Sequence, residues 1–566
     1  MNRKNKLSDL QNNLVHQLRT ILMEGNSSAE KKYLLQTVSN YTIFDFKSTQ
    51  LYHDTLLFLL AYPQNEELLK LTKHNLKLLS NKLFDHFLKV SEKEKWKWIK
   101  TGLTFSIIKS TFSFTITNWI LKNFKNAVSY NSSEADYETL KIVFRQLLPS
   151  GVCEVYFENK FSLKHLAIKI SGDKKVNVLE WTIIQFENST LDENTKEQIF
   201  ALLKIYIDWN LSADAPSRTT ARGSSKKIFF QQNESLIKSI DFKTAIAKPD
   251  FKNLSPDYKS KQQLVNAARG ILCSLYRETD PVTYTSVNET EYFELRRGVS
   301  IALFYMKPSF RLPLESYVGY MAFRNNIPIA YGGGWIFQQS ARFGINILSA
   351  FRGGESAFIF SELIKLYHHH FGVNYFHIEP YQIGQKNPDG IKSGAFWFYY
   401  RLGFRPMQIA LSDLAAKEFE KINRDKSYRT EKKILVMLAD SEMMIDFSTD
   451  QQKKISPAEI AHELEQHVSK NYHYDFNACA MFAKKNLLKQ FRSKKIKFQP
   501  SENSKLLSEL VMYFNLYSER KNKSVSELKT ISKLIESKCS GTEIDFIRVL
   551  HQLHSNYFSN QKLLAV

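Results

Sequence analysis

Apolar positions recur at helical spacing along most of the chain, and extended patterns gather near its middle. In residues 67–88 the apolar side chains fall every three or four positions, as at Leu68 and Leu76, which is typical of an amphipathic helix. Residues 166–184 fit either helices or a hairpin. The pattern predicts a mostly helical N-terminal region, residues 1–245.

The middle of the chain mixes helical and extended patterns. Residues 261–276 have helical spacing, and Asn325-Asn326 is a favourable two-residue hairpin turn between extended segments. The predicted extended segments are 293–305, 317–324 and 327–337. Gly332-Gly333-Gly334 interrupts the last of them, and consecutive glycines in a strand indicate a bulge or a close approach of backbone or ligand.

Helical spacing returns after Ser412. The predicted C-terminal helices are 414–423, 434–444, 457–471, 478–491 and 524–535. A basic cluster surrounds Phe491 and Phe498, and its members are Lys484, Lys485, Arg492, Lys494, Lys495 and Lys497. This cluster fits either a solvated helix face or a nucleic-acid footprint.

The predicted fold class is α+β, with a central mixed sheet flanked by helices and mostly helical regions on both sides. We expect three parts at residues 1–245, 255–412 and 413–566, because 566 residues exceed what one core usually holds. Residues 212–227 are small, polar and basic, so they are expected to form a flexible connector or exposed loop.

The charge and the cysteine content of the chain indicate which partners and which cellular location to expect. The chain has 78 Lys and Arg against 57 Asp and Glu, a net charge of +21, which favours anionic partners such as nucleic acid, an acidic surface or phosphorylated cofactors. Its four cysteines form no CxxC pair, so no zinc site or disulfide framework is expected. We expect a cytoplasmic protein without a secretory signal or a membrane span.

A candidate anion site lies between a predicted strand, residues 345–351, and a predicted helix, residues 357–371. The turn between them reads Arg352-Gly353-Gly354-Glu355-Ser356. Free backbone N–H groups and the positive end of the helix dipole suit a phosphate at such a turn, and Arg352 adds a charged fork.

Two other chemistries are weighed for the same stretch. Gly354-Glu355-Ser356-Ala357-Phe358 approaches a serine-hydrolase nucleophile elbow, although Phe358 replaces the last glycine. His368-His369-His370 invites a metal site, but adjacent helical residues point in different directions and cannot converge on one ion. No metal site is therefore predicted.

Residues 261–412 resemble the GNAT superfamily of acyl-CoA-dependent N-acyltransferases. The family's pyrophosphate loop is matched by Arg352 and Ala357, while Glu355 stands where the family has glycine. The family's Ala, a Tyr four residues later, and Leu-Gly-Phe at the end of its fourth helix are matched by Ala395, Tyr399, Leu402, Gly403 and Phe404.

The resemblance implies a GNAT-like mixed sheet and acetyl-CoA or another acyl-CoA as co-substrate, with an unidentified amine as acceptor. It implies Tyr399 as the general acid that protonates the thiolate. His377 and Glu379, which alternate on one predicted strand, are the candidate bases. The implied cofactor-binding residues are Leu348, Ser349, Ala350, Arg352, Gly353, Gly354, Ser356 and Ala357.

A rival interpretation is a non-catalytic basic interaction protein or nucleic-acid-binding protein with a degenerate GNAT-like core. Glu355 is the sequence argument for it, since a carboxylate beside the turn repels a phosphate unless it points away or pairs with Arg352. Binding to acyl-CoA, or steeply salt-dependent binding to nucleic acid, separates the two interpretations.

Overall fold

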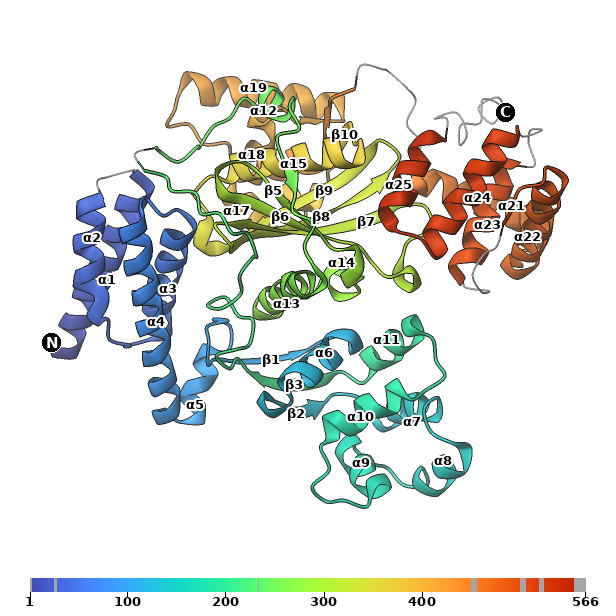
Figure 1. The fold of residues 1–566 in the computed structure, drawn as a ribbon, viewed down its shortest axis with the longest axis horizontal. Coiled ribbons are helices and arrows are strands. Elements are labelled where there is room, and N and C mark those ends of the chain that lie inside the picture. Colours follow the sequence, from blue (N-terminus) through green and yellow to red (C-terminus); the bar gives the residue numbers. More distant parts are fainter. Residues whose placement is uncertain are drawn as a thin grey trace.

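A mixed sheet of nine strands forms the centre of this α+β protein (Figure 1). The computed structural model describes residues 3–24, 28–232, 234–448, 456–498, 505–518 and 524–553. The strands of this sheet are β4 (Lys252–Asn253), β5 (Glu291–Glu294), β6 (Val299–Phe304), β7 (Ser316–Arg324), β8 (Ile327–Phe337), β9 (Ser340–Ile347), β10 (Tyr375–Ile378), β11 (Arg405–Pro406) and β12 (Met443–Asp446).

The strand order is β11-β12-β10-β9-β8-β7-β6-β5-β4, and only β9 and β10 run parallel. Their pairing covers just 340–342 against 375–377, although β9 continues to Ile347 along β8. Beyond these three pairs β9 and β10 are no longer joined. Such a parting of neighbouring strands exposes unpaired backbone groups in the middle of a sheet.

The predicted hairpin between β7 and β8 is confirmed. Asn325 and Asn326 both have positive φ, 48° and 66°, as a type I′ turn requires. The glycines of β8 allow close approach and not a bulge: a Cβ on Gly332 would lie 2.3 Å from the carbonyl oxygen of Gly344, and the shift in the β7–β8 register lies instead next to Ala322.

Helices cover both faces of the sheet (Figure 1). On one face lie α13 (Tyr258–Ser274), which agrees with the helix predicted there, and α14 (Asp280–Thr283); over the other lie α15, α18 and α19. The other helices of the central part are α12, which lies between β3 and β4, and α16, α17 and α20, which lie between the later strands. The bounds of these helices and of α15, α18 and α19 are α12 (Phe242–Ile246), α15 (Ser356–Phe371), α16 (Pro380–Ile383), α17 (Pro388–Ser393), α18 (Ala395–Arg401), α19 (Ile409–Arg424) and α20 (Lys432–Leu438).

The bounds of one predicted strand and one predicted helix are wrong. The strand expected at 345–351 ends at Ile347, because Phe351 donates its N–H to Leu348 and residues 349–351 form a short 3-10 turn. The helix expected at 434–444 ends at Leu438. Residues 443–446 form β12, so the central sheet extends past residue 412.

The N-terminal part consists of two units. Four helices stand beside the sheet and share one hydrophobic core with it: α1 (Arg3–Glu24), α2 (Ser28–Thr37), α3 (Phe46–Ala61) and α4 (Glu66–Lys89). The short α5 (Glu92–Lys95) follows α4 and has no buried residue. A separate lobe has its own core around β1 (Ile107–Thr111), β2 (Val128–Ser133) and β3 (Ile205–Asn210), with α6 (Phe114–Phe124), α7 (Tyr137–Arg145), α8 (Ser150–Tyr156), α9 (Leu163–Ser171), α10 (Val178–Glu187) and α11 (Glu193–Leu202).

The hairpin alternative for residues 166–184 is wrong. Gly172 at φ 70° ends α9, and the Asn177 side chain accepts the N–H of Glu180 to cap α10. The two caps satisfy backbone groups at the helix ends that a hairpin would have used in a ladder.

The segment 212–227, expected to be a flexible connector or an exposed loop, is exposed at residues 213–214 and 226–227 but buried at residues 215, 217–219 and 221. Ser217 is fully buried, and Arg218 Nη2 pairs with the Asp54 carboxylate of α3 at 2.6 Å. A Cβ on Gly270 of α13 would lie 2.1 Å from the Pro216 carbonyl oxygen. The polar composition of this segment therefore serves a buried hydrogen-bonded path, because its polar groups have partners inside the protein.

Five C-terminal helices form a bundle with a third core, namely α21 (Pro457–Tyr472), α22 (Phe476–Ser493), α23 (Lys505–Ser518), α24 (Val525–Cys539) and α25 (Glu543–Gln552). The buried Arg311 joins this bundle to the sheet. Its guanidinium contacts the carboxylates of Glu289 at 2.8 Å and Glu543 at 3.0 Å. Lys538 also pairs with Glu543.

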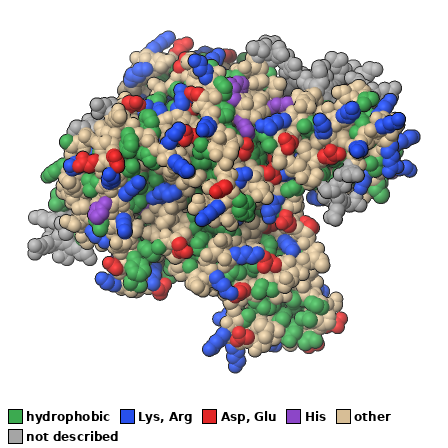
Figure 2. Space-filling view, in the orientation of Figure 1, with side chains coloured by type: hydrophobic (Ala, Val, Ile, Leu, Met, Phe, Trp, Pro, Cys, Tyr) green, Lys and Arg blue, Asp and Glu red, His purple; other side chains and the backbone are tan. Residues whose placement is uncertain are grey.

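Lys and Arg side chains are conspicuous on the C-terminal bundle in the space-filling view (Figure 2). The basic cluster of the sequence lies mainly on α22 and just after it. In the part of the chain that the structure describes, no helix has the length and apolar character needed to cross a bilayer.

Candidate active site

The turn that precedes α15 has the features of an anion site. Arg352 and Gly353 are exposed, and Gly353 has a φ of 82°. Within the described chain, the N–H groups of Ser356, Ala357 and Phe358 have no hydrogen-bond acceptor, whereas Ile359 donates to Glu355. Three free N–H groups at the positive end of a 16-residue helix can receive an anion.

Glu355 points away from this turn. Its side chain is fully buried, and its carboxylate contacts the guanidinium groups of Arg324 and Arg297, each at 3.0 Å. It also accepts the N–H of Ile237 at 3.1 Å. Because two arginines neutralise this carboxylate inside the protein, it does not compete with a phosphate at the exposed turn.

Gly354 is buried under the N-terminal helices. A Cβ at this position would lie 3.3 Å from the Phe58 ring and 3.4 Å from the Tyr62 hydroxyl of the α3 end. The α1 residue Arg19 donates to the Ala350 carbonyl oxygen at 2.6 Å. The N-terminal helices therefore brace the back of the turn and leave its Arg352 side open.

The residues expected to bind the pantetheine arm lie where β9 ends. Leu348 donates its N–H to Ile329 of β8 at 2.9 Å, and Ser349 and Ala350 belong to the following 3-10 turn. The backbone that β9 leaves unpaired toward β10 is therefore residues 343–347, slightly earlier than the expected segment.

Tyr399 lies on α18 and packs against α15. Its ring meets Phe360 of α15 edge-on at 5.5 Å and Phe404 at 5.8 Å. Burial raises the pKa of the Tyr399 hydroxyl well above its usual range, and within the described residues this hydroxyl has no hydrogen-bond partner. It is thus a protonated donor at neutral pH with its hydrogen bond unused. Its neighbour Tyr400 instead packs under the Arg405 guanidinium.

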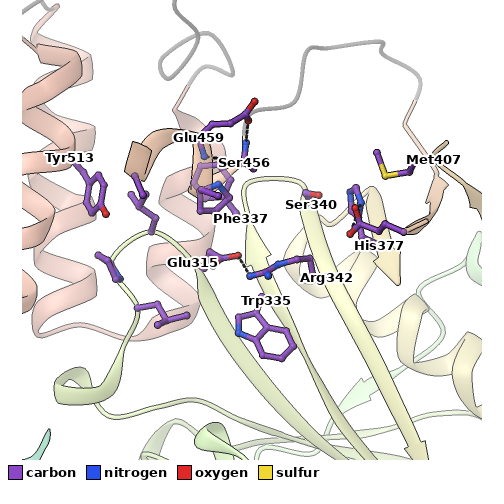
Figure 3. Close-up of a pocket in the computed structure, with 17 residues that line it drawn as sticks. Glu315, Trp335, Phe337, Ser340, Arg342, His377, Met407, Ser456, Glu459 and Tyr513 are labelled. Atoms are coloured by element: carbon purple, nitrogen blue, oxygen red, sulfur yellow. Dashed lines mark hydrogen bonds and ion pairs between the residues drawn. The ribbon is translucent and has the colours of Figure 1, made fainter. Parts of the chain in front are cut away.

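A cavity of about 670 Å³ opens between the sheet and the C-terminal bundle (Figure 3). The apolar part of its wall comprises Leu312, Pro313, Leu314, Trp335, Phe337, Met407, Pro457, Ala458, Ala461 and Tyr513. Its polar part comprises Glu315, Ser340, Arg342, His377, Glu442, Ser456 and Glu459. The size and the mixed wall are those of a small-molecule site.

The candidate bases belong to this cavity or border it. His377 of β10 lines it, and His377 Nδ1 lies 3.5 Å from a Glu442 carboxylate oxygen. Glu379 follows β10 and pairs with Arg342 at 3.3 Å, while Arg342 also donates to Glu315 at 2.8 Å. The Arg342 guanidinium lies 5.6 Å from the Trp335 ring. These contacts hold three carboxylates and an imidazole around one wall.

Tyr399 and His377 approach the sheet from opposite faces. Phe376 packs on Phe343, which in turn packs on Phe360 of α15, so the α15 face holds Phe376, and His377 alternates to the other face. The structure therefore does not place the expected acid and base side by side. The two faces meet only where β9 and β10 part.

Two alternative chemistries find no supporting geometry among the described residues. The Ser356 hydroxyl makes no hydrogen bond with a histidine. The three adjacent histidines diverge: His368 and His369 bond to the carbonyl oxygens of Val373 and Ile246, and His370 bonds to Glu291. No group of three ligating side chains suited to a metal is found in the described ranges.

The sequence interpretation missed most of the cavity. Trp335 and Arg342 are adjacent in the β8–β9 ladder, and period-two alternation in these strands could have put them on one face. Tyr513 and Pro457 come from the C-terminal bundle, more than a hundred residues further along the chain. No local pattern in the sequence signals such a contact.

Comparisons of the chain with protein-family models, with curated proteins and with solved structures give no match.

Proposed function

We propose that this protein is an acyl-CoA-dependent N-acyltransferase of the GNAT type that moves an acetyl or longer acyl group to an amine by direct attack. The observation that carries the proposal is the turn before α15, where free N–H groups and an exposed Arg352 lie beside the point at which β9 and β10 part. The order β9, α15, β10 and α18 supports it, because this is the order on which the resemblance rests.

The pyrophosphate of the acyl-CoA is bound by the N–H groups of Ser356 and Ala357 and by Arg352. The pantetheine arm then follows the edge of β9 that β10 leaves unpaired, whose backbone groups can bond its amides, apart from the Gly344 carbonyl oxygen, which accepts from the Tyr320 hydroxyl at 2.8 Å. In this arrangement the thioester lies between the two faces of the sheet, with Tyr399 on the α15 side.

The chemical step needs a general acid for the departing thiolate and a group that accepts the proton of the amine. The amine nitrogen attacks the acyl carbon, the carbon–sulfur bond breaks, and the departing thiolate takes the proton of the Tyr399 hydroxyl. His377 or Glu379, directly or through water, accepts the proton that the amine loses. Burial raises the pKa of Tyr399, so its hydroxyl is protonated at neutral pH, and the proton leaves it only as negative charge develops on the sulfur.

The cavity beside His377 supports an amine attached to an apolar body as the acceptor. Glu315, Glu442 and Glu459 offer negative charge to an ammonium group, and Trp335 offers an aromatic face. Its apolar wall would exclude water from the rest of the acceptor.

Calorimetric titration with acetyl-CoA and with a longer acyl-CoA tests this proposal. We expect saturable binding by the native protein and at least tenfold weaker binding by Arg352→Glu, because the substitution puts a negative charge beside the phosphates. Arg424→Glu is the matched control, since Arg424 on α19 is highly exposed and pairs only with Glu420. A folded sample that binds neither acyl-CoA would end the proposal.

A second candidate function is nucleic-acid binding through α22. Lys484, Lys485, Lys489 and Arg492 line an open groove of about 500 Å³ together with Met481 and Leu488. Basic side chains around an apolar floor suit a phosphate backbone. Oligonucleotide affinity that falls steeply with salt, without affinity for acyl-CoA, would favour this function over the acyltransferase.

A further inference from the structure

A second cavity, of about 520 Å³, lies at the other end of β8. Helix α4, the segment around Arg222 and the β7–β8 turn at Asn325 and Asn326 form its walls. It belongs to neither the turn before α15 nor the cavity beside His377, and it shares no lining residue with them.

The charge of this cavity has one sign. Lys73 and Lys77 lie one helical turn apart on α4, and Arg222 lines the same cavity; no carboxylate is among its lining residues. Among the described residues, none of these three cations takes part in an ion pair. Side chains four residues apart share one face of a helix, so both ammonium groups serve the same opening.

Arg222 is the unusual member. Burial lowers the pKa of its guanidinium to about 10, and no carboxylate offsets that effect. Within the described residues, Arg222 Nη1 donates to the Ala221 carbonyl oxygen at 2.7 Å. The Arg222 side chain is half-buried, and a partly desolvated guanidinium without a counter-ion is costly, so an anion bound beside it would lower that cost.

The neutral polar groups of the cavity are already used. The hydroxyl of Ser80 donates to Leu76, that of Thr220 donates to Ala215, and the Asn326 amide donates to Ser225. The side-chain hydrogen-bond donors that remain available in the wall are therefore the cationic ones. Such donors favour a ligand group that carries more than one negative charge and several acceptor oxygens.

We infer that this cavity binds a small soluble molecule that carries a phosphate or diphosphate group, with Arg222 at the base and Lys73 and Lys77 at the mouth. The other wall is apolar, formed by Leu60, Leu69, Leu76, Ile228 and Ile327. The ligand class is thus a phosphate ester with an apolar or aromatic ring, such as a nucleotide, and the volume suits a molecule of that size.

Calorimetry with pyrophosphate, ATP and adenosine tests the inference. Pyrophosphate supplies the anion alone, adenosine the ring alone, and ATP both. We expect ATP to bind more tightly than pyrophosphate, adenosine to bind at least tenfold more weakly than ATP, and the ATP affinity to fall as salt rises. Absence of ATP and pyrophosphate binding by the folded protein would overturn the inference.

The variant Lys73→Gln/Lys77→Gln removes the two exposed charges without disturbing a buried contact. We expect at least a tenfold loss of ATP affinity. The matched control is Lys70→Gln/Lys89→Gln, with the same helix and the same change in charge but outside the cavity. Equal losses in the two double variants would show a nonspecific charge effect and would refute the site.

The turn before α15 also suits a diphosphate, so the titrations are repeated in the Arg352→Glu background. There the lysine pair should still matter for ATP while acyl-CoA binding is already weakened. If the lysine effect disappears in that background, ATP binds at the turn and this inference fails, whereas the acyltransferase proposal stands.

Discussion

The two ends of strand β8 present opposite chemistries. Beyond Phe337 the C-terminal bundle closes a cavity with three glutamates, one histidine and Arg342. At Ile327 the N-terminal helices close a cavity lined by three cations, none of which has an ion-pair partner in the described part of the chain, and by no acid. The strand is the same, so the difference comes from the helices laid against its ends. The flanking regions thus supply the selectivity that a sheet alone does not specify.

The largest expected effect concerns the buried ions at the N-terminal end. Glu355→Gln leaves Arg324 and Arg297 without their shared carboxylate, and breaking a buried ion pair costs about 3–5 kcal/mol of unfolding free energy. Urea unfolding measures it. Glu66→Gln, which breaks an exposed ion pair with Lys70, should leave the urea midpoint where it is.

A loss in Glu355→Gln no larger than in Glu66→Gln would mean that the cluster around Glu355 is solvated. The cationic end would then resemble the surface, and the contrast between the two ends would weaken.

At the other end of β8, next to the C-terminal bundle, the contribution of Lys538 to the free energy of unfolding should depend on pH. Burial is the main cause that lowers the pKa of Lys538 from 10.5 to about 8. Between pH 8 and 10.5 the unfolded chain holds this proton and the folded chain does not, so the Lys538 contribution makes unfolding less favourable as pH rises. The change is on the order of 3 kcal/mol across this window.

Urea unfolding of the native protein and of Lys538→Met at several pH values isolates this contribution, since the other titrating groups are common to both proteins. We expect the stability of the native protein to gain on that of the variant between pH 8 and 10.5. Parallel pH profiles of the two proteins would show that the pKa of Lys538 is the same in the folded and the unfolded chain.

Between the two ends, Tyr399→Phe tests the acid. Because the hydroxyl has no protein partner, removing it should change the unfolding free energy by less than about 1 kcal/mol. Acyl transfer from acetyl-CoA to a panel of apolar primary amines, followed by thiol release, should fall about a hundredfold. Tyr400→Phe is the control beside it, and an equal loss there would remove Tyr399 from the mechanism.

The smallest effect is expected for Arg342→Gln, which tests the acidic character of the cavity beside His377. Arg342→Gln removes the arginine of the acidic cavity, and because its side chain is 43% exposed, the stability change should stay below about 1 kcal/mol. An apolar ammonium ligand such as phenethylamine should bind severalfold more tightly by calorimetry, since Glu315 and Glu379 lose their counter-ion. Weaker binding would mean that Arg342, and not the glutamates, recognises the ligand.

Local patterns predicted local structure well. The turn at Asn325-Asn326 follows from the residue types that tolerate positive φ, and α13 and α15 follow from apolar spacing and, for α15, from the glycine at its end. These features depend on neighbours in the chain.

Features that depend on distant residues were not predictable. Residues 212–227 look solvated because their partners, Asp54 and Gly270, lie far away in the chain. The orientation of Glu355 depends on Arg297 and Arg324, and the cavity depends on how the C-terminal bundle docks. Amino-acid composition describes what a segment contains, whereas burial depends on what folds over it.

The hydrophobic core shared by the N-terminal helices and the central sheet bears on how this chain can be divided. Residues of α1, α3 and α4 belong to the same core as those of β6, β7, β8 and α15, while the lobe around β1–β3 and the C-terminal bundle have their own. An excised fragment 255–412 would expose the wall that α3 covers. The smallest piece that keeps the core of the sheet complete thus joins the first helices to the sheet, although more than 150 residues separate them along the chain.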